Sequence, residues 1–182
     1  SSAASDVYKR QTILKRMNRK YTREQYFEKC EMLREAYDAP ALTTDVIVGF
    51  PGETDEEFEE TVQYLTELNL YEMHIFKYSP RKGTVAAAMK DQVSPEVKNK
   101  RSDVLLELAE RGKKAYEAKY EGAELEVLVE EVLHREDGTY LRGHTERYMD
   151  ILIKAGDIPM PESFVNSFVY VRYTQNGDIL MV

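Results

Sequence analysis

The sequence predicts an α/β fold followed by a small all-β barrel. Residues 42–49 read as a strand, a helix begins after Thr54, and residues 71–78 read as a second strand. Helices and strands that alternate with short links are typical of βα units around a parallel sheet. After Gly122 the pattern changes to five short strands in about sixty residues, which favours an antiparallel barrel of the oligonucleotide-binding kind. The expected strands are 124–130, 139–143, 148–154, 164–173 and 178–182, with a hairpin turn at residues 176–177.

This change of pattern predicts two domains. We place the first at residues 12–119 and the second, the β-barrel, at residues 120–182. Residues 1–11 are polar and carry no periodicity, so we interpret them as a disordered or artefactual leader and exclude them from the fold.

Helix boundaries and packing faces can be predicted in the first domain. Thr22 and Gln25 stand in the spacing of a capping box, and apolar residues follow at helical intervals. Cys30 lies on that apolar stripe, so we expect a small core residue. Pro95 suits the first position of a long helix.

The glycine-rich stretch after the first strand has the sequence DVIVGFPGET. Its β-branched run, residues 46–48, suits a strand that is buried on both faces. Gly49 and Gly52 permit backbone angles that side chains forbid, and Pro51 fixes the turn between them. Thr54 then caps the next helix, with Glu57 completing a capping box.

Composition excludes several kinds of protein. The chain has 182 residues, a net charge of −8, 42% hydrophobic residues and a single cysteine. The apolar share is sufficient for a core, no stretch is long enough to span a bilayer, and a broad basic surface for nucleic acid is absent. One cysteine and no signal-peptide pattern predict a reducing, cytoplasmic location.

Metal ligands are scarce in the sequence. Cys30 has no cysteine neighbours, so thiolates of this chain cannot supply a zinc or iron–sulfur ligand set. His74, His134 and His144 lack the spacing of metal ligands, and we interpret them as surface or packing residues.

Three stretches together resemble one family. Residues 15–22 read KRMNRKYT, residues 43–54 read TTDVIVGFPGET, and residues 76–84 read FKYSPRKGT. In order and spacing they resemble the second half of a radical S-adenosylmethionine methylthiotransferase. Residues 143–145, GHT, match the Gly-x-Thr position of the TRAM domain that closes those enzymes.

The resemblance covers residues 12–182 and implies a fold and an activity. It implies the C-terminal part of a partial TIM-type barrel, followed by a TRAM barrel. Residues 41–50, 86–101 and 143–148 look most similar to the branch that methylthiolates C2 of N6-threonylcarbamoyladenosine in tRNA. The implied cofactors are S-adenosylmethionine and [4Fe–4S] clusters, and the implied partner is the anticodon arm of tRNA, with no membrane.

The sequence departs from the family in one respect. The family's amino-terminal domain and its Cys-x-x-x-Cys-x-x-Cys loop are not in this sequence. The chain therefore resembles a carboxy-terminal fragment that is inactive alone, with cluster ligands only in a full-length parent.

The resemblance also implies cofactor-binding residues. Arg19 is expected to hold the methionine carboxylate, and Phe76 and Tyr78 to lie near one edge of S-adenosylmethionine. Alternatives remain: a surface salt bridge for Arg19 and core packing for Phe76. The loop beside the adenine comprises Val48, Gly49, Phe50, Pro51, Gly52 and Glu53. Glycines there are expected to let main-chain groups approach the nucleoside.

Basic and aromatic residues of the second domain form the expected RNA-binding set. Such side chains hold unpaired bases by stacking. The set comprises Arg142, His144, Thr145, Arg147, Tyr148, Arg172 and Tyr173, and Lys113 and Lys114 of the long helix extend it. A solvated helix face explains those two lysines equally well.

Other functions stay open. One is a stand-alone RNA-binding module of the TRAM type, and another is a sugar-phosphate-type TIM-barrel piece joined to an unrelated β domain. Within the family, isopentenyladenosine in tRNA or a ribosomal protein is an alternative substrate.

Overall fold

The structure is a computed structural model that describes residues 12–156, 158–175 and 180–181. The predicted leader, residues 1–11, lies outside the described residues. The chain divides into two compact units, the first ending at Lys113 and the second beginning at Lys114. Each unit has its own sheet, so we describe them separately.

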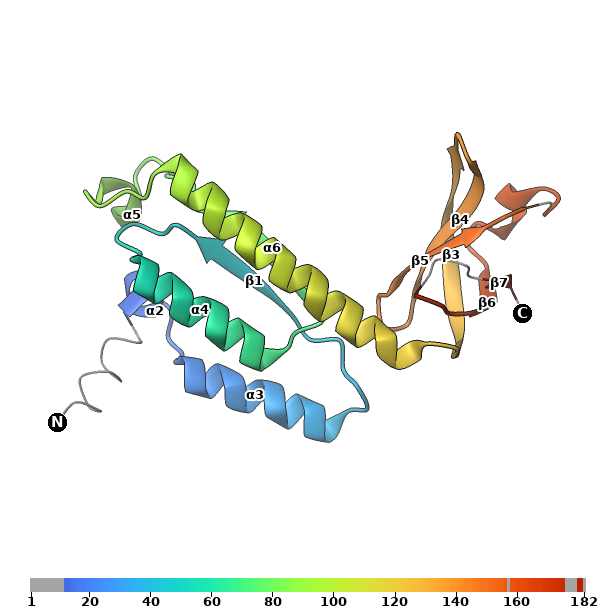
Figure 1. Ribbon diagram of the computed structural model, residues 1–182, viewed down its shortest axis with the longest axis horizontal. Helices are drawn as coiled ribbons and strands as arrows, with labels where there is room; N and C mark the ends of the chain where they lie inside the picture. The colour runs from blue at the N-terminus through green and yellow to red at the C-terminus, as the bar shows by residue number, and fades with distance from the viewer. Residues whose placement is uncertain (1–11, 157, 176–179, 182) are drawn as a thin grey trace. The chain divides into compact units, whose positions relative to one another are not determined.

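The first unit alternates helices with two parallel strands, as the sequence predicts. Strands β1 and β2 pair in parallel from Thr43 opposite Glu72 to Val48 opposite Lys77. Helices α4 and α6 run along this small sheet (Figure 1). The elements are α2 (Thr12–Arg16), α3 (Arg23–Ala36), β1 (Thr43–Val48), α4 (Asp55–Leu68), β2 (Glu72–Lys77), α5 (Val85–Ala88) and α6 (Pro95–Glu117).

The core of the first unit lies between the sheet and the helices. Val48 and Met73 of the strands pack there with Leu68 of α4 and Leu105 of α6. Cys30 is buried in this cluster, which confirms its prediction as a core residue. Burial raises the pKa of the Cys30 thiol above its usual value.

The opposite face of the β1–β2 sheet is not covered by the described residues. Asp45, His74 and Phe76 point away from the core and are exposed. The expectation of a first strand buried on both faces is therefore wrong within the described residues, whose helices pack on one face of the sheet.

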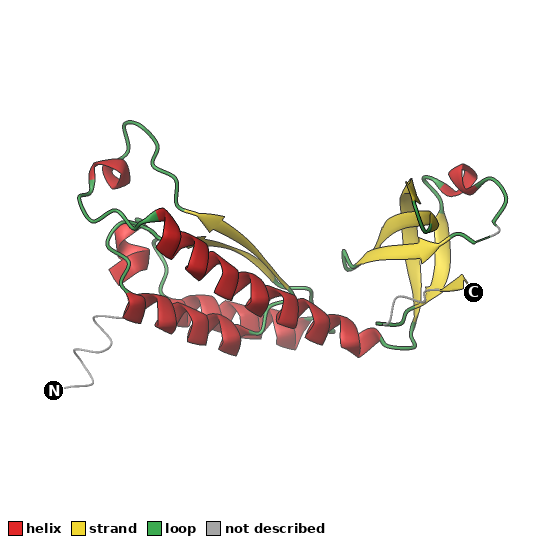
Figure 2. Ribbon diagram, turned by 45° about the horizontal axis from the view of Figure 1, so that its top comes forward, coloured by secondary structure: helices red, strands yellow, loops and turns green. Residues whose placement is uncertain are grey.

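The second unit is a curled antiparallel sheet (Figure 2). Among the described residues it has five strands in the order β5-β4-β3-β6-β7, with a bulge between Val129 and Glu131. The elements are the short 3-10 helix η1 (Ala118–Tyr120), β3 (Glu124–Arg135), β4 (Gly138–Thr145), β5 (Asp150–Lys154), η2 (Pro161–Phe164), β6 (Phe168–Arg172) and β7 (Leu180–Met181).

Two strands of the second unit begin later than the sequence predicts. The strand expected from Tyr148 begins at Asp150, because Tyr148 has a positive φ of 59° that ends extended structure. The strand expected from Phe164 begins at Phe168, since a 3-10 turn and a positive φ at Asn166 precede it. The hairpin turn expected at residues 176–177 lies outside the described residues.

None of the helices within the described residues is both long and apolar enough to cross a membrane.

Candidate functional site

The glycine turn follows β1 at its carboxyl end. Gly49 and Gly52 have φ values of 71° and 76°, which explains why glycine stands at both positions. Thr54 accepts a hydrogen bond from the Glu57 amide, and the Glu57 side chain accepts one from the Thr54 amide. The predicted capping box is confirmed, and it begins α4 directly after the turn.

Both glycines also make room for side chains of this chain. A Cβ on Gly49 would overlap the Cγ of Lys98, and a Cβ on Gly52 would lie 2.6 Å from Nη1 of Arg16. Arg16 Nη1 donates to the Gly52 carbonyl oxygen at 2.7 Å, and Nη2 pairs with Glu57 at 2.6 Å. Two cationic side chains therefore pack closely against these glycines, and the approach of a nucleoside to the backbone here stays a prediction.

The buried side chain of Glu53 accepts hydrogen bonds from the backbone of the turn. Its side chain is 6% exposed, and Oε2 accepts hydrogen bonds from the amides of Gly49 and Phe50. Arg101 of α6 pairs with Oε1 at 3.4 Å. Burial raises the pKa of Glu53 above its usual value, although Arg101 and the two amides oppose this shift. The two amides are therefore occupied within the protein.

The loop after β2 packs against this turn. The rings of Phe50 and Tyr78 meet edge to face with centroids 5.2 Å apart, and the Tyr78 amide donates to the Val48 carbonyl at 2.9 Å. Lys98 Nζ donates to the Tyr78 carbonyl at 2.9 Å. The buried Tyr78 hydroxyl has no hydrogen-bond partner among the described residues.

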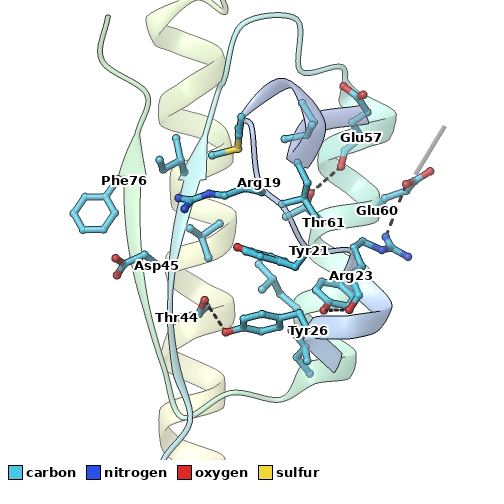
Figure 3. Close-up of a pocket in the computed structure, with 18 residues that line it drawn as sticks. Arg19, Tyr21, Arg23, Tyr26, Thr44, Asp45, Glu57, Glu60, Thr61 and Phe76 are labelled. Atoms are coloured by element: carbon cyan, nitrogen blue, oxygen red, sulfur yellow. Dashed lines mark hydrogen bonds and ion pairs between the residues drawn. The ribbon is translucent and has the colours of Figure 1, made fainter. Parts of the chain in front are cut away.

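A pocket of about 250 Å³ lies between β1 and helices α2, α3 and α4 (Figure 3). Arg19 extends toward β1, and the rings of Tyr21 and Tyr26 point the same way. Arg19 forms no ion pair within the described residues, so the salt-bridge alternative has no support there. Phe76 is 52% exposed, so core packing does not explain it.

The expected cofactor residues thus fall into two groups. Arg19 and Phe76 line the pocket. The turn residues and Tyr78 lie together at the carboxyl ends of the strands. Val48 and Pro51 are fully buried, so their role is to support the turn. Sequence reasoning missed Lys98, Arg101 and Arg16, whose contacts connect distant segments.

The expected RNA-binding residues are also divided. His144 lies directly across β3 residue Leu128, whereas Arg172 pairs with Glu124 further along that strand. The Tyr148 ring is 79% exposed and lies 5.7 Å from the ring of His144. The structure therefore groups Tyr148 with His144 and separates Arg172 from them.

Several members of that set have structural roles. Thr145 is buried, and its hydroxyl accepts hydrogen bonds from the amides of Arg147 and Met149. Arg147 lies over the Tyr120 ring at 5.7 Å. Tyr173 is buried, and its hydroxyl donates to Glu117 at 3.4 Å, so stacking on a base is wrong for this ring as it lies.

Carboxylates lie beside two of the basic side chains of this sheet. Arg142 pairs with Asp150 and Glu131, each at 2.9 Å, and these bonds raise the pKa of Arg142. His144 Nδ1 lies 2.9 Å from Glu130. Sequence reasoning missed Phe168, which is 63% exposed and also lies across from Leu128. Its only signal was the alternation of aromatic residues in β6.

Comparisons with known proteins identify the family. The model of the radical SAM superfamily matches residues 3–65. The chain is 41% identical over 167 residues to the threonylcarbamoyladenosine tRNA methylthiotransferase MtaB of Bacillus subtilis, covering 91% of this chain and 36% of that protein. The chain belongs to the radical SAM methylthiotransferase family.

Relatives of a second kind are similarly close. The chain is 43% identical over 167 residues to the tRNA-2-methylthio-N(6)-dimethylallyladenosine synthase of Geobacillus kaustophilus, covering 90% of this chain and 30% of that protein. The corresponding synthase of Oceanobacillus iheyensis is 42% identical over 163 residues, which cover 90% of this chain and 30% of that protein. The chain thus spans about a third of the length of these curated relatives.

The family's two kinds of cofactor fit this chain differently. Arg19 lines the pocket without an ion pair among the described residues, which suits a carboxylate such as that of S-adenosylmethionine, whereas the buried Tyr78 hydroxyl that lacks a partner belongs to the other group. An iron–sulfur cluster does not fit, because the one cysteine is buried in the core. The described residues contain no group of three or more His, Cys, Asp or Glu side chains placed to hold a metal ion.

Proposed function

We propose that this chain is the part of a tRNA methylthiotransferase that holds S-adenosylmethionine and contacts the tRNA. One observation carries the proposal: the three family stretches converge on one turn. Arg16 of the first stretch bonds Gly52 of the second, and Tyr78 of the third packs on Phe50. Parallel βα folds bind ligands at this end of their strands.

The proposed reaction adds a methylthio group to C2 of N6-threonylcarbamoyladenosine in tRNA. S-adenosylmethionine and iron–sulfur clusters supply the radical chemistry when bound, and the cluster ligands would have to come from residues other than those of this chain. In this chain Arg19 would hold the methionine carboxylate, while the loops that carry Phe50 and Tyr78 would border the nucleoside. The alternative substrate is the isopentenyl-type adenosine, on which relatives of the second kind act by name.

A chimeric enzyme tests substrate choice. Residues 12–182 replace the matching segment of the Bacillus subtilis relative, and of a dimethylallyladenosine relative in parallel. Mass spectrometry of tRNA nucleosides then reads the products. Methylthio-threonylcarbamoyladenosine from the first chimera alone supports the proposal. Products from the second chimera alone would assign the chain to the other branch, and no product from either would favour an RNA-binding module without enzymatic activity.

The second unit is proposed to bind the anticodon arm weakly, through His144 and the exposed Tyr148. Each stacked base contributes roughly 1–3 kcal/mol, whereas the paired Arg142 adds little attraction until a phosphate displaces a carboxylate. Binding should therefore be weak and sensitive to salt.

Fluorescence anisotropy with an anticodon stem-loop at two salt concentrations measures this binding. Arg142→Ala combined with Tyr148→Ala should reduce the affinity. The matched control, Lys154→Ala combined with Tyr170→Ala, also removes one cation and one exposed aromatic ring from the same sheet. Equal losses in both double variants would contradict a contact centred on Tyr148.

A further inference from the structure

Helix α6 sends two cationic side chains, one turn apart, to the two loops at the strand ends. Lys98 lays its aliphatic stem against Gly49 and donates from Nζ to the Tyr78 carbonyl at 2.9 Å. Arg101 reaches the Glu53 carbonyl at 3.2 Å and the Glu53 carboxylate at 3.4 Å. One helix therefore contacts both the turn after β1 and the loop after β2.

Burial of the charged Arg101 side chain is unfavourable in free energy, because it removes the charge from water. Arg101 is 5% exposed, and its Nη2 also pairs with Asp55 at 2.7 Å. Its Nε has no hydrogen-bond partner among the described residues, and its guanidinium lies 5.3 Å from the centre of the Phe58 ring. Buried ion pairs often add less stability than apolar residues of equal volume, so stability alone is a weak explanation for this one.

Lys98 and Arg101 each fix one of the two loops at the strand ends. Arg101 fixes the Glu53 carboxylate, which in turn holds the amides of Gly49 and Phe50. Lys98 fixes the main chain at Tyr78, whose ring faces Phe50. The main chain of both strand-end loops is therefore held by two side chains of one helix.

We infer that Lys98 and Arg101 are positioning residues, which hold the main chain of the two strand-end loops in the geometry that receives the nucleoside of the ligand. This inference rests on the proposed function of the strand-end loops as the S-adenosylmethionine site. Neither cation needs to touch the ligand. The planar fork of Arg101 bonds a carbonyl and two carboxylates at once, which the point charge of a lysine cannot reproduce.

Three variants of the chain separate positioning from folding. Lys98→Met keeps the stem over Gly49 and removes the bond to Tyr78. Arg101→Lys keeps the positive charge and removes the planar fork. A loosened loop in this variant would therefore show that the fork, rather than the charge, holds the loop. The matched control is Lys100→Met, which removes an exposed charge from the same helix.

The first measurement is hydrogen exchange of the Gly49, Phe50 and Tyr78 amides by NMR, without ligand. Arg101→Lys should accelerate exchange at Gly49 and Phe50, and Lys98→Met at Tyr78, each by about tenfold, roughly the strength of one hydrogen bond. Lys100→Met should change none of them. Unaltered exchange in both test variants, with unfolding temperatures equal to the control, would overturn the inference.

The second measurement is calorimetric titration with S-adenosylhomocysteine, a redox-inert probe, well below the unfolding temperature. Both test variants should bind it about tenfold more weakly than the control does. Accelerated exchange with unchanged affinity would overturn the positioning role while leaving the proposed function intact. Absence of binding even in the unsubstituted chain would contradict the proposed site itself, and the exchange data would then show a purely structural clamp.

Discussion

The carbonyl oxygen of Leu128 lies where a side chain on Gly143 would begin. A Cβ at Gly143 would overlap that oxygen and the α-carbon of Val129. The contact occurs beside the bulge between Val129 and Glu131, where β3 bends against β4. Glycine in the GHT stretch is therefore required by the packing of two backbones, independently of any ligand.

Gly143→Ala should destabilise the second unit. Its φ is not in the left-handed region, so the effect tests steric overlap alone. Overpacking of this kind costs about 1–3 kcal/mol. Urea unfolding followed by circular dichroism measures the change, with Lys154→Ala on the neighbouring strand as a surface control expected within about 0.5 kcal/mol. Equal stabilities of the two variants would show that the backbone at the bulge moves to admit the Cβ without loss of stability.

Gly112→Ala tests a competition between helix propensity and packing in the first unit. Alanine inside α6 should gain about 1 kcal/mol from propensity. Its Cβ, however, would lie 2.5 Å from the carbonyl oxygen of Leu70, a backbone atom that cannot rotate away. We expect packing to dominate and the unfolding free energy to fall by about 1 kcal/mol or more.

The control for that substitution is Arg111→Ala, which changes an exposed neighbour on the same helix. Urea denaturation of both variants, at one protein concentration, gives the comparison. A stabilised Gly112→Ala protein would mean that the loop at Leu70 moves freely.

Glu53→Gln should change how stability depends on pH. Burial raises the folded-state pKa of Glu53 above its usual value, so folding favours the protonated carboxyl. Its contribution to stability is fully present below the unfolded pKa and is lost as the pH rises through the folded pKa. Glutamine does not titrate, so the variant should gain stability relative to the unsubstituted protein as the pH rises across that window.

Unfolding free energies at closely spaced pH values measure this difference. The exposed Glu59→Gln serves as the control, since it removes a carboxyl from α4 without touching the turn. If the difference in unfolding free energy between Glu53→Gln and the unsubstituted protein does not change between the unfolded and folded pKa of Glu53, Arg101 and the two amides cancel the effect of burial.

Local signals predicted the elements of this fold, but distant partners define the turn. Both capping boxes follow from residues three apart, and Cys30 follows from helical spacing. The occupants of the space at Gly49 and Gly52 are Lys98 and Arg16, which no spacing rule connects to them. Tyr173 and Phe168 show the same limit, because alternation along a strand does not tell which face is buried.

The last prediction concerns iron–sulfur chemistry. After anaerobic reconstitution, the chain should hold no stoichiometric [4Fe–4S] cluster. Such clusters take three or four thiolate ligands, and the sequence has only Cys30. This thiol is buried among Val48, Leu65 and their neighbours, and its raised pKa disfavours the thiolate that iron requires. Iron and acid-labile sulfide, determined on the monomer after gel filtration, should both be far below one equivalent of cluster. Cys30→Ala, carried through the same treatment, gives the background from adventitious iron. A full cluster in the unsubstituted monomer, lost in Cys30→Ala, would mean that the core opens around Cys30 and that ligands other than thiolates complete the site.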